Sequence, residues 1–334
     1  MNSWLALLAA FLVTLAAIFP FRRLAMRFGI LDHPGGHKSH ANPIPYLGGL
    51  TVLAGLAIAL AYFSPGLWRI LVLLALVAGL GLVDDILSIK VSTKVISEVI
   101  LAATAVALGF TWHLTDSTAI NVGLSLLWIV GLTNSFNLLD NMDGLSSTIA
   151  VGSLVTVAIV APPTAPLAAP LAGAALGFLV INWPPARMYL GDSGSLMLGL
   201  GVALCSIAAA NTAHGLHSLV LLLLPVGLAV FDTSLVIASR LASGRPVQLG
   251  GRDHFSHRLR LLGWSPRRIL AAVVAASIAS GLIAALALTY PLGEAWLAVP
   301  IAFAYLVAWL RLLRVDPYSV AGPQGLEVYR AGNE

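Results

Sequence analysis

Long apolar runs alternate with short polar segments along almost the whole chain. A helix that crosses a lipid bilayer needs about 20 predominantly apolar residues. Eleven runs approach this length, and we predict helices over 3–20, 46–63, 67–83, 94–111, 120–136, 144–161, 167–182, 194–211, 218–240, 268–289 and 295–312. The pattern leaves no room for a soluble domain of any size. We therefore predict an all-α, polytopic membrane protein with about eleven transmembrane helices.

The composition agrees with this pattern and excludes several other classes of protein. Hydrophobic residues make up 59% of the chain and charged residues 10%, with a mean hydropathy of +0.93. A soluble domain carries about 25% charged residues. The basic pI of about 9.5 therefore concerns orientation in the membrane, and we expect no nucleic-acid partner. The single cysteine, Cys205, lies in an apolar run, which excludes a disulfide framework and a thiolate metal site.

The basic residues predict the orientation of the helices, because cytoplasmic loops of membrane proteins are enriched in Lys and Arg. With the predicted helices, every Lys and Arg except Arg69 falls on one side of the membrane. This side is then cytoplasmic, with the N-terminus outside and the C-terminus inside. Residues 1–314 form one transmembrane domain, and the tail at 315–334 is cytoplasmic. The cytoplasmic loops are 21–45, 84–93, 183–193 and 241–267.

The acids and histidines follow the same distribution. The predicted cytoplasmic side holds Asp84, Asp85, Asp140, Asp143, Asp192, Asp253, His37, His40, His254 and His257. Polar chemistry at one membrane face indicates a site that opens to the cytoplasm. A transporter would instead place ionisable residues near the midplane, in both halves of the bundle.

Four oxygen-bearing residues recur at every third position of one stretch: Asn134, Asn137, Asp140 and Asp143. Positions i and i+3 are neighbours on one face of a helix, so these side chains predict a polar stripe. Hard oxygen donors suit Mg²⁺ or a polar ligand. The alternative is a helix end that caps itself with Asn and Asp, which explains one or two such residues but four only poorly.

Two further segments carry charge at predicted helix ends. Asp84 and Asp85 close the third helix, where acids oppose the helix dipole and repel each other, so a cation should compensate. Lys94 lies within reach, although it is also spaced i, i+4 from Glu98 and the two can pair. In the first cytoplasmic loop, Lys38 and His40 suit either a phosphate or anionic lipid.

The segment from Arg187 to Ser195 contains the sequence Gly-Asp-Ser-Gly-Ser at the start of a helix. Asp192 in this motif has two possible roles. It is an ordinary N-cap of the helix, or it holds a metal ion while the neighbouring backbone N–H groups bind an anion.

Asp232 lies inside the predicted helix 218–240, and both a functional role and a bond to a neighbouring helix stay open.

The last cytoplasmic loop contains His254 and His257 at i, i+3, flanked by Arg252 and Arg258. This set is too sparse for a zinc site because no third ligand is in place. It suits a pyrophosphate, which the planar guanidinium groups of arginine recognise well. A merely basic loop at the membrane surface is the alternative.

In this order, the motifs resemble those of the polyprenyl-phosphate N-acetylhexosamine-1-phosphate transferases, the MraY/WecA/TagO-like superfamily. The resemblance covers about residues 30 to 265 and rests on 43–49, the pair 84–85, 134–145, 185–195 and the loop with both histidines. It implies that a UDP-N-acetylhexosamine gives its sugar-1-phosphate to undecaprenyl phosphate, with release of UMP. The reaction would need Mg²⁺, with Mn²⁺ as an alternative, and would start a cell-envelope polysaccharide at the bacterial plasma membrane. Members of this superfamily often form homodimers, but the sequence itself does not set the oligomeric state.

The resemblance also implies roles for individual residues. Asp192 is the expected Mg²⁺ ligand, with Asn137 as a second oxygen beside it. Asp84 and Asp85 are expected at the attacking lipid phosphate, and Asp140 and Asp143 as catalytic or nucleotide-site acids. The substrate-binding residues are then Lys38, His40, Lys94, Asn134, Arg187, Arg252, His254, His257 and Arg258.

The sequence departs from the family pattern in the stripe and in the last loop. Asn141 replaces the first Gly of Asp-Gly-x-Asp-Gly, Ser256 replaces one His of His-x-His-His, and Gly251 stands where an Asp often precedes the Arg. The last loop is nearer to the N-acetylglucosamine branch than to the branch that uses UDP-MurNAc-pentapeptide, so UDP-GlcNAc is the expected donor. UDP-GalNAc and a deoxy-N-acetylhexosamine are alternatives, as is the phospho-MurNAc-pentapeptide reaction. A membrane transporter and a non-catalytic lipid-carrier binding protein are the other classes.

Overall fold

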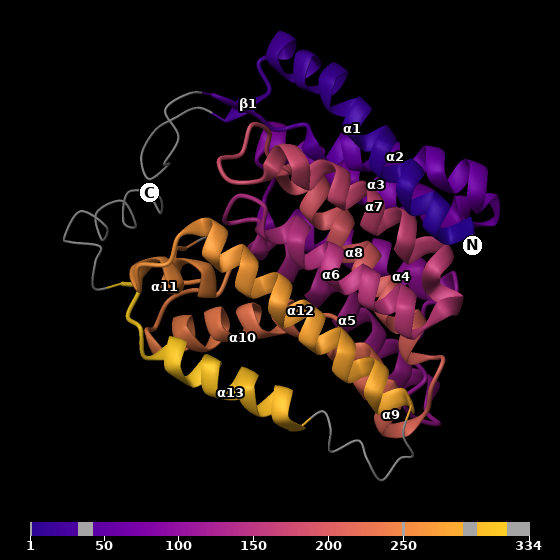
Figure 1. Ribbon diagram of the computed structural model, residues 1–334, viewed down its shortest axis with the longest axis vertical. Helices are drawn as coiled ribbons and strands as arrows, with labels where there is room; N and C mark the ends of the chain where they lie inside the picture. The colour runs from indigo at the N-terminus through magenta and orange to yellow at the C-terminus, as the bar shows by residue number, and fades with distance from the viewer. Residues whose placement is uncertain (1, 33–42, 249–250, 290–298, 319–334) are drawn as a thin grey trace.

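The computed structural model describes residues 2–32, 43–248, 251–289 and 299–318 of the chain. In these residues the helices form one bundle (Figure 1). Its longer helices are α1 (Asn2–Phe28), α2 (Gly48–Phe63), α3 (Trp68–Leu87), α4 (Val91–Ala107), α5 (Thr118–Leu139), α6 (Leu145–Val160), α7 (Ala165–Asn182), α8 (Gly191–Ala210), α10 (Gly227–Ala242), α12 (Pro266–Thr289) and α13 (Val299–Leu313). The shorter elements are α9 (Gly215–Leu223), α11 (Phe255–Leu261), the single-turn 3₁₀ helices Pro65–Leu67 and Pro162–Thr164, and the strands β1 (Leu31–Asp32) and β2 (Ile44–Pro45).

The predicted polytopic, helical architecture is confirmed, and each predicted helix coincides with helical structure in the described residues. Six of these helices are long and apolar enough to cross a membrane, or seven if α9 and α10 form one bent span. The helices α2, α6 and α13 are apolar but shorter. The orientation of the termini across the membrane stays a prediction.

Three features of the fold differ from the sequence prediction. The predicted helix 218–240 is two helices, α9 and α10, which meet at an angle of 74°. Pro225 lies at this break, and a proline removes one backbone hydrogen bond and clashes with the preceding turn. The helix α11 lies in a segment predicted to be loop. The antiparallel pair of β1 and β2 is a small departure from a purely helical chain.

α7 and α8 form the core of the bundle and are the most buried of the apolar spans. In an apolar stretch of 18 residues from each span, 78% and 94% of the residues are buried, against 22% for α1. Both helices are apolar on nearly every face, as expected for largely buried helices, although Leu176 and Val180 of α7 are exposed. Small residues let the neighbouring backbones approach. A Cβ atom on Gly173 of α7 would lie 2.1 Å from the carbonyl oxygen of Leu7 in α1.

The polar helix ends gather on one side of this core. Figure 1 shows β1 and α11 toward one end of the bundle and α9 toward the other. Hydrogen bonds at the first end join α3 to α8, α4 to both of them, and α11 to the segment that follows α5. The segments that carry the sequence motifs therefore converge, and the candidate site is built there.

Candidate active site

The carboxylate of Asp85, in the last turn of α3, holds the start of α8. Its Oδ1 accepts the backbone N–H of Asp192 at 2.9 Å, and its Oδ2 accepts the N–H of Ser193 at 3.2 Å. The first N–H groups of a helix have no partner within the helix and carry partial positive charge. Asp85 therefore caps α8 from another helix. The N–H groups of α8 thereby compensate the negative charge of Asp85, which is unfavourable at the C-terminal end of the α3 dipole.

Lys94, near the start of α4, joins two of the predicted acids. Its ammonium donates to Asp84 Oδ2 at 2.8 Å and also pairs with Asp192. The alternative that Lys94 simply pairs with Glu98 is wrong for this structure, because Glu98 instead accepts a hydrogen bond from the amide of Asn134. Lys94 thus compensates the charge at the end of α3, as the sequence requires.

The polar stripe is helical only in its first half. The helix α5 ends at Leu139, so Asp140 and Asp143 lie beyond it and not on the same helical face. Asn137 donates to Ser195 Oγ of α8 at 3.2 Å. Asp143 Oδ2 accepts the backbone N–H of Ala186 at 2.9 Å. The residues of the stripe therefore contact different parts of the bundle: α4, α8 and the loop before α8.

Asp140 is surrounded by other acids. Burial, together with the charges of Asp192, Asp85 and Asp143, raises the pKa of Asp140 to about 8. We call Asp84, Asp85, Asp140, Asp143 and Asp192 the acid cluster. Lys94 pairs with two members of this cluster, Asp84 and Asp192. An excess of negative charge at a site of this kind favours the binding of a cation.

The donor set of the acid cluster fits a magnesium ion better than a transition metal. The described residues contain no group of three or more His, Cys, Asp or Glu side chains arranged to hold a metal on their own. Mg²⁺ does not need such a group, because it is usually held by one or two carboxylates together with water and substrate phosphates. Asp192, with the Asn137 amide nearby, provides oxygen ligands of this type.

The end of the first loop packs directly against the segment before α8. Tyr189 donates its backbone N–H to Pro45 at 2.8 Å, and Gly49 donates to Leu190 at 2.9 Å. A Cβ atom on Gly49 would lie 2.3 Å from the backbone nitrogen of Gly194, so only glycine permits this approach. Two motifs that are 140 or more positions apart in the sequence thus form one surface. Lys38 and His40 lie outside the described residues.

The histidine loop, which we define as residues 251–261, contacts the segment after α5 through Ser256. His254 Nδ1 lies 2.7 Å from Asp232 Oδ2 of α10, and the rings of His254 and His257 are 5.9 Å apart. Burial, together with the charges of His254 and Arg252, lowers the pKa of His257 to about 4. His257 is therefore a neutral ring near pH 7 until an anion approaches. Its Nδ1 is buried without a hydrogen-bond partner in the described structure.

Two of the three sequence departures from the family pattern, Asn141 and Ser256, contact each other. Ser256 Oγ donates to Asn141 Oδ1 at 2.6 Å, and Asn141 Nδ2 donates to the carbonyl of Leu138 at 2.7 Å. Ser256 is buried. This hydrogen bond ties the histidine loop to the acid cluster, because Asn141 lies directly after Asp140.

Arg258 does not fit the predicted role as a fixed charge for a diphosphate. Its side chain is fully buried. It donates to Ser239 Oγ at 2.6 Å and to the carbonyls of Asp253, Leu312 and Val315. These bonds use the guanidinium inside the fold, where it joins the histidine loop to the end of α13. Arg187 and Arg252 are exposed, so their predicted contacts with a substrate stay open.

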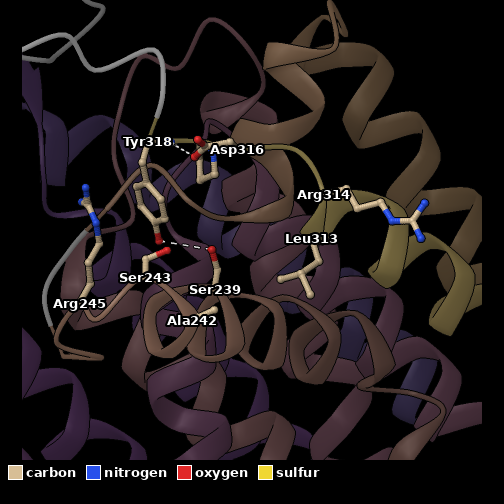
Figure 2. A pocket seen from close by; sticks show the side chains of 9 residues that line it. Ser239, Ala242, Ser243, Arg245, Leu313, Arg314, Asp316 and Tyr318 are labelled. Atoms are coloured by element: carbon tan, nitrogen blue, oxygen red, sulfur yellow. Dashed lines mark hydrogen bonds between the residues drawn. The ribbon is translucent and has the colours of Figure 1, made fainter.

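A second buried arginine supports the histidine loop from behind. Arg240 of α10 holds Asp253 through two hydrogen bonds of 2.7 and 2.8 Å, and Tyr318 donates to the same carboxylate at 2.8 Å. Burial raises the pKa of Asp253, but the bonds from Arg240 and Tyr318 prevail and lower it to about 2. Figure 2 shows the pocket beside these residues, with Tyr318 directed toward Ser239. The lining of this pocket includes none of the acid cluster.

Several residues of this arrangement were not among the predicted site residues. Glu98, Ser195, Asn182 and Asp232 each bond a predicted residue or its segment. Asp232 and Glu98 each had a signal in the sequence, since both are carboxylates inside apolar runs, and Ser195 lies in the Gly-Asp-Ser-Gly-Ser motif. The amide of Asn182 accepts the N–H of Gly144 at 2.8 Å and donates to the carbonyl of Met188 at 2.9 Å, which joins the end of the stripe to the segment before α8.

Comparison with known proteins places these features in a family. The sequence profile of glycosyl transferase family 4 matches residues 67–210. A probable undecaprenyl-phosphate N-acetylglucosaminyl 1-phosphate transferase of Bacillus subtilis is 30% identical over 275 residues, which cover 77% of this chain and 77% of the relative. The chain belongs to glycosyl transferase family 4.

Other family 4 relatives differ in the substrate that their names state. A decaprenyl-phosphate N-acetylglucosaminephosphotransferase of Mycobacterium tuberculosis is 30% identical over 310 residues, covering 79% of this chain and 77% of the relative. A phospho-N-acetylmuramoyl-pentapeptide-transferase of Levilactobacillus brevis is 28% identical over 316 residues, covering 80% of this chain and 93% of the relative. The sequence prediction of a superfamily that contains both branches is confirmed.

Proposed function

We propose that this family 4 member transfers N-acetylglucosamine-1-phosphate from UDP-N-acetylglucosamine to undecaprenyl phosphate and releases UMP. An oxygen of the lipid phosphate forms a bond to the β-phosphorus of the nucleotide sugar. The bond from that phosphorus to the bridging oxygen breaks, and UMP leaves with this oxygen. The observation that carries the proposal is the convergence of the acid cluster, Lys94 and the histidine loop at one end of a membrane bundle.

The charges of the reactants explain why such a site is needed. Both substrates are anionic phosphates that repel each other, and more negative charge develops on the leaving UMP. A phosphate monoester is already a nucleophile near neutral pH, so positioning and charge stabilisation matter more than a strong base. Lys94 provides one fixed cation between Asp84 and Asp192, and the exposed Arg187 and Arg252 provide others for the nucleotide diphosphate.

The proposed cofactor is Mg²⁺, held by Asp192 with Asn137 beside it. When bound, the ion would neutralise phosphate charge and orient the diphosphate. The residues of this chain do the rest. Asp85 fixes the backbone that carries Asp192 through its bonds to the N–H groups of Asp192 and Ser193. Asp84 holds Lys94 in place. The support for the metal is the donor set and the excess of negative charge around Asp140.

The proposed donor is a simple UDP-N-acetylhexosamine and not UDP-MurNAc-pentapeptide. The Bacillus subtilis and Mycobacterium tuberculosis relatives, both at 30% identity, are named for N-acetylglucosamine phosphate transfer, and the pentapeptide transferase is at 28%. Within the site, Ser256 stands where the family has a histidine, and its hydroxyl donates a hydrogen bond to Asn141. With Arg258 also used inside the fold, the histidine loop has fewer groups for a peptide carboxylate.

The test is a side-by-side assay of the purified protein with undecaprenyl phosphate, Mg²⁺ and a panel of UDP-sugars. We expect UMP release only when both substrates are present, with mass spectrometry showing a lipid-linked N-acetylhexosamine pyrophosphate. Omission of the lipid controls for hydrolysis of the nucleotide sugar. Faster lipid product from UDP-MurNAc-pentapeptide than from any simple UDP-N-acetylhexosamine would contradict the donor assignment. No UMP release with any donor would contradict the reaction itself.

A further inference from the structure

A buried carboxylate in α10 makes two contacts with the histidine loop. Asp232 Oδ2 lies 2.7 Å from His254 Nδ1, and Asp232 Oδ1 accepts the backbone N–H of Phe255 at 2.8 Å. Asp232 is 0% exposed and His254 is 3% exposed. Both oxygens of one carboxylate therefore bond the first residues of the loop, and the complete burial of Asp232 keeps it away from a substrate.

These contacts determine which nitrogen of His254 is available. An ionised carboxylate only accepts hydrogen bonds, so the imidazole nitrogen that faces it must carry the proton. With Nδ1 protonated and bonded to Asp232, Nε2 is the one ring nitrogen left for another partner. In the neutral ring, Nε2 is an acceptor. In the protonated ring it donates to an anion, while Asp232 stabilises the positive charge.

The surroundings of the pair favour this assignment. Arg240, two turns further along α10, is occupied by Asp253 through two short hydrogen bonds. The guanidinium therefore does not replace His254 as the partner of Asp232. The ring of Phe255 packs edge-on against Phe231 of α10 at 6.1 Å between centroids. Such apolar surroundings strengthen a hydrogen bond between charged or polar groups.

We propose that Asp232 is a positioning residue for the transfer reaction: it fixes His254 as the Nδ1-protonated ring and presents Nε2 to the phosphates of the substrates. This inference rests on the proposed function. It assigns a role to a carboxylate that touches no substrate and that lies 22 positions before the histidine it orients. Residues that orient a functional histidine through a hydrogen bond change activity by about 10- to 100-fold when they are altered.

The decisive variant is Asp232→Asn, because asparagine keeps the size of the side chain. Its carbonyl oxygen still accepts the N–H of Phe255, but its amide donates to His254 Nδ1. The ring is then forced into the opposite tautomer, with the proton on Nε2. We expect kcat to fall by about 100-fold. The matched control is Thr233→Val in the next position, where a buried hydroxyl has no partner in the described structure; we expect activity close to wild type.

Two readouts separate a positioning role from a structural one. Nitrogen-15 NMR of histidine-labelled protein, with the His254 signal assigned from His254→Gln, should show protonated Nδ1 in the wild type and bare Nδ1 in Asp232→Asn. In the His254→Gln background, Asp232→Asn should cause little further loss of kcat. A purely structural role predicts loss of thermal stability with an unchanged tautomer, or equal losses of kcat in both backgrounds, and either result overturns the inference.

The tautomer of His254 in the wild type tests the positioning role of Asp232 even if the Asp232→Asn variant does not fold. A neutral His254 ring with its proton on Nε2 in the wild type would overturn the inference directly. Failure of the proposed function is distinguishable, because it would appear as a wild-type protein that releases no UMP from any donor. The NMR measurement would still show whether Asp232 fixes the protonated Nδ1.

Discussion

The acid cluster and the histidine loop are joined by the hydrogen bond from Ser256 to Asn141, but different interactions hold them in place. The acid cluster is fixed by backbone geometry: Asp85 bonds two N–H groups at the start of α8, and Asp143 bonds one before it. The histidine loop is fixed by buried charged side chains, Asp232, Arg240 and Arg258. Changes in the first region should therefore act on catalysis directly. Changes behind the second should act through its position and stability.

The largest effect is expected for Asp192→Asn. An amide of equal size cannot provide the negative charge that neutralises Mg²⁺, so several kcal/mol of charge stabilisation would be lost, which is at least about 10³-fold in kcat. The variant should still insert and fold, because α8 keeps the cap from Asp85. UMP release and thermal unfolding in detergent measure the two effects. Near-normal turnover at ordinary Mg²⁺ would remove Asp192 from the metal role.

The next largest effect separates the two adjacent aspartates. In Asp85→Asn, the amide nitrogen faces one of the N–H groups of Asp192 and Ser193 and leaves it without an acceptor, at a cost of about 1–3 kcal/mol. We expect both thermal stability and kcat to fall. In the matched variant Asp84→Asn, the pair with Lys94 weakens but the α8 cap stays. Stability should change less there. Equal losses of stability in both variants would contradict the capping role of Asp85.

Replacement of Arg258 tests whether buried charged side chains hold the histidine loop in place. Arg258→Met leaves several carbonyls at the end of α13 without a donor, and we expect about 3 kcal/mol of destabilisation. Activity should fall together with stability. Arg252→Gln, at an exposed position in the same loop, should instead raise the KM for the UDP-sugar without a change in thermal stability. A raised KM at full stability in Arg258→Met would restore the predicted diphosphate role.

The two regions also differ in how well the sequence predicts them. The helices could be predicted because an apolar run of about 20 residues has few alternatives in a membrane protein. The sequence also predicts which residues belong to the acid cluster, since Asp84, Asp140 and Asp192 each lie at the end or the start of such a run. The end of α5 at Leu139 could not, because the spacing of three continues past it into Asp140 and Asp143. Gly144, with a φ of 73°, marks the turn that follows.

The histidine loop shows what sequence patterns miss. Its histidines are visible, but the groups that hold it lie in α10, at the end of α13 and in the segment after α13, and no local spacing links them. Arg258 and Arg252 look equivalent in the sequence, and only the fold shows that one is buried and the other exposed. Asp232 similarly read as either functional or structural. Its contact with His254 could not be inferred, because the bend at Pro225 sets the direction of α10.

A pH series should distinguish the histidine loop from the acid cluster. With its pKa lowered to about 4, His257 binds no proton in the folded state between about pH 4 and 6.5, whereas the unfolded chain does. The unfolded state then binds more protons, so the contribution of His257 to the free energy of unfolding rises with pH over this window. His257→Gln should flatten that part of the thermal stability profile. Asp116→Asn, at an exposed position in the segment between α4 and α5, is the control and should leave the profile unchanged there. An unchanged slope in His257→Gln would contradict the lowered pKa.

The smallest effect is expected for Tyr318→Phe, which tests whether the chain after α13 supports the histidine loop. The hydroxyl donates to Asp253 at 2.8 Å and lies 3.4 Å from Ser239 Oγ (Figure 2). Its loss should cost about 1 kcal/mol, the usual net value of one hydrogen bond. The ring stays over the guanidinium of Arg245, so the pocket keeps its shape. Thermal stability should fall by a few degrees, with kcat lowered less than in Asp232→Asn.

Tyr305→Phe, which removes a hydroxyl that pairs with Ser280 between α12 and α13, is the matched control: it should lose similar stability without any change in kcat. Equal kcat losses in both variants would show that the segment after α13 has no special link to the histidine loop.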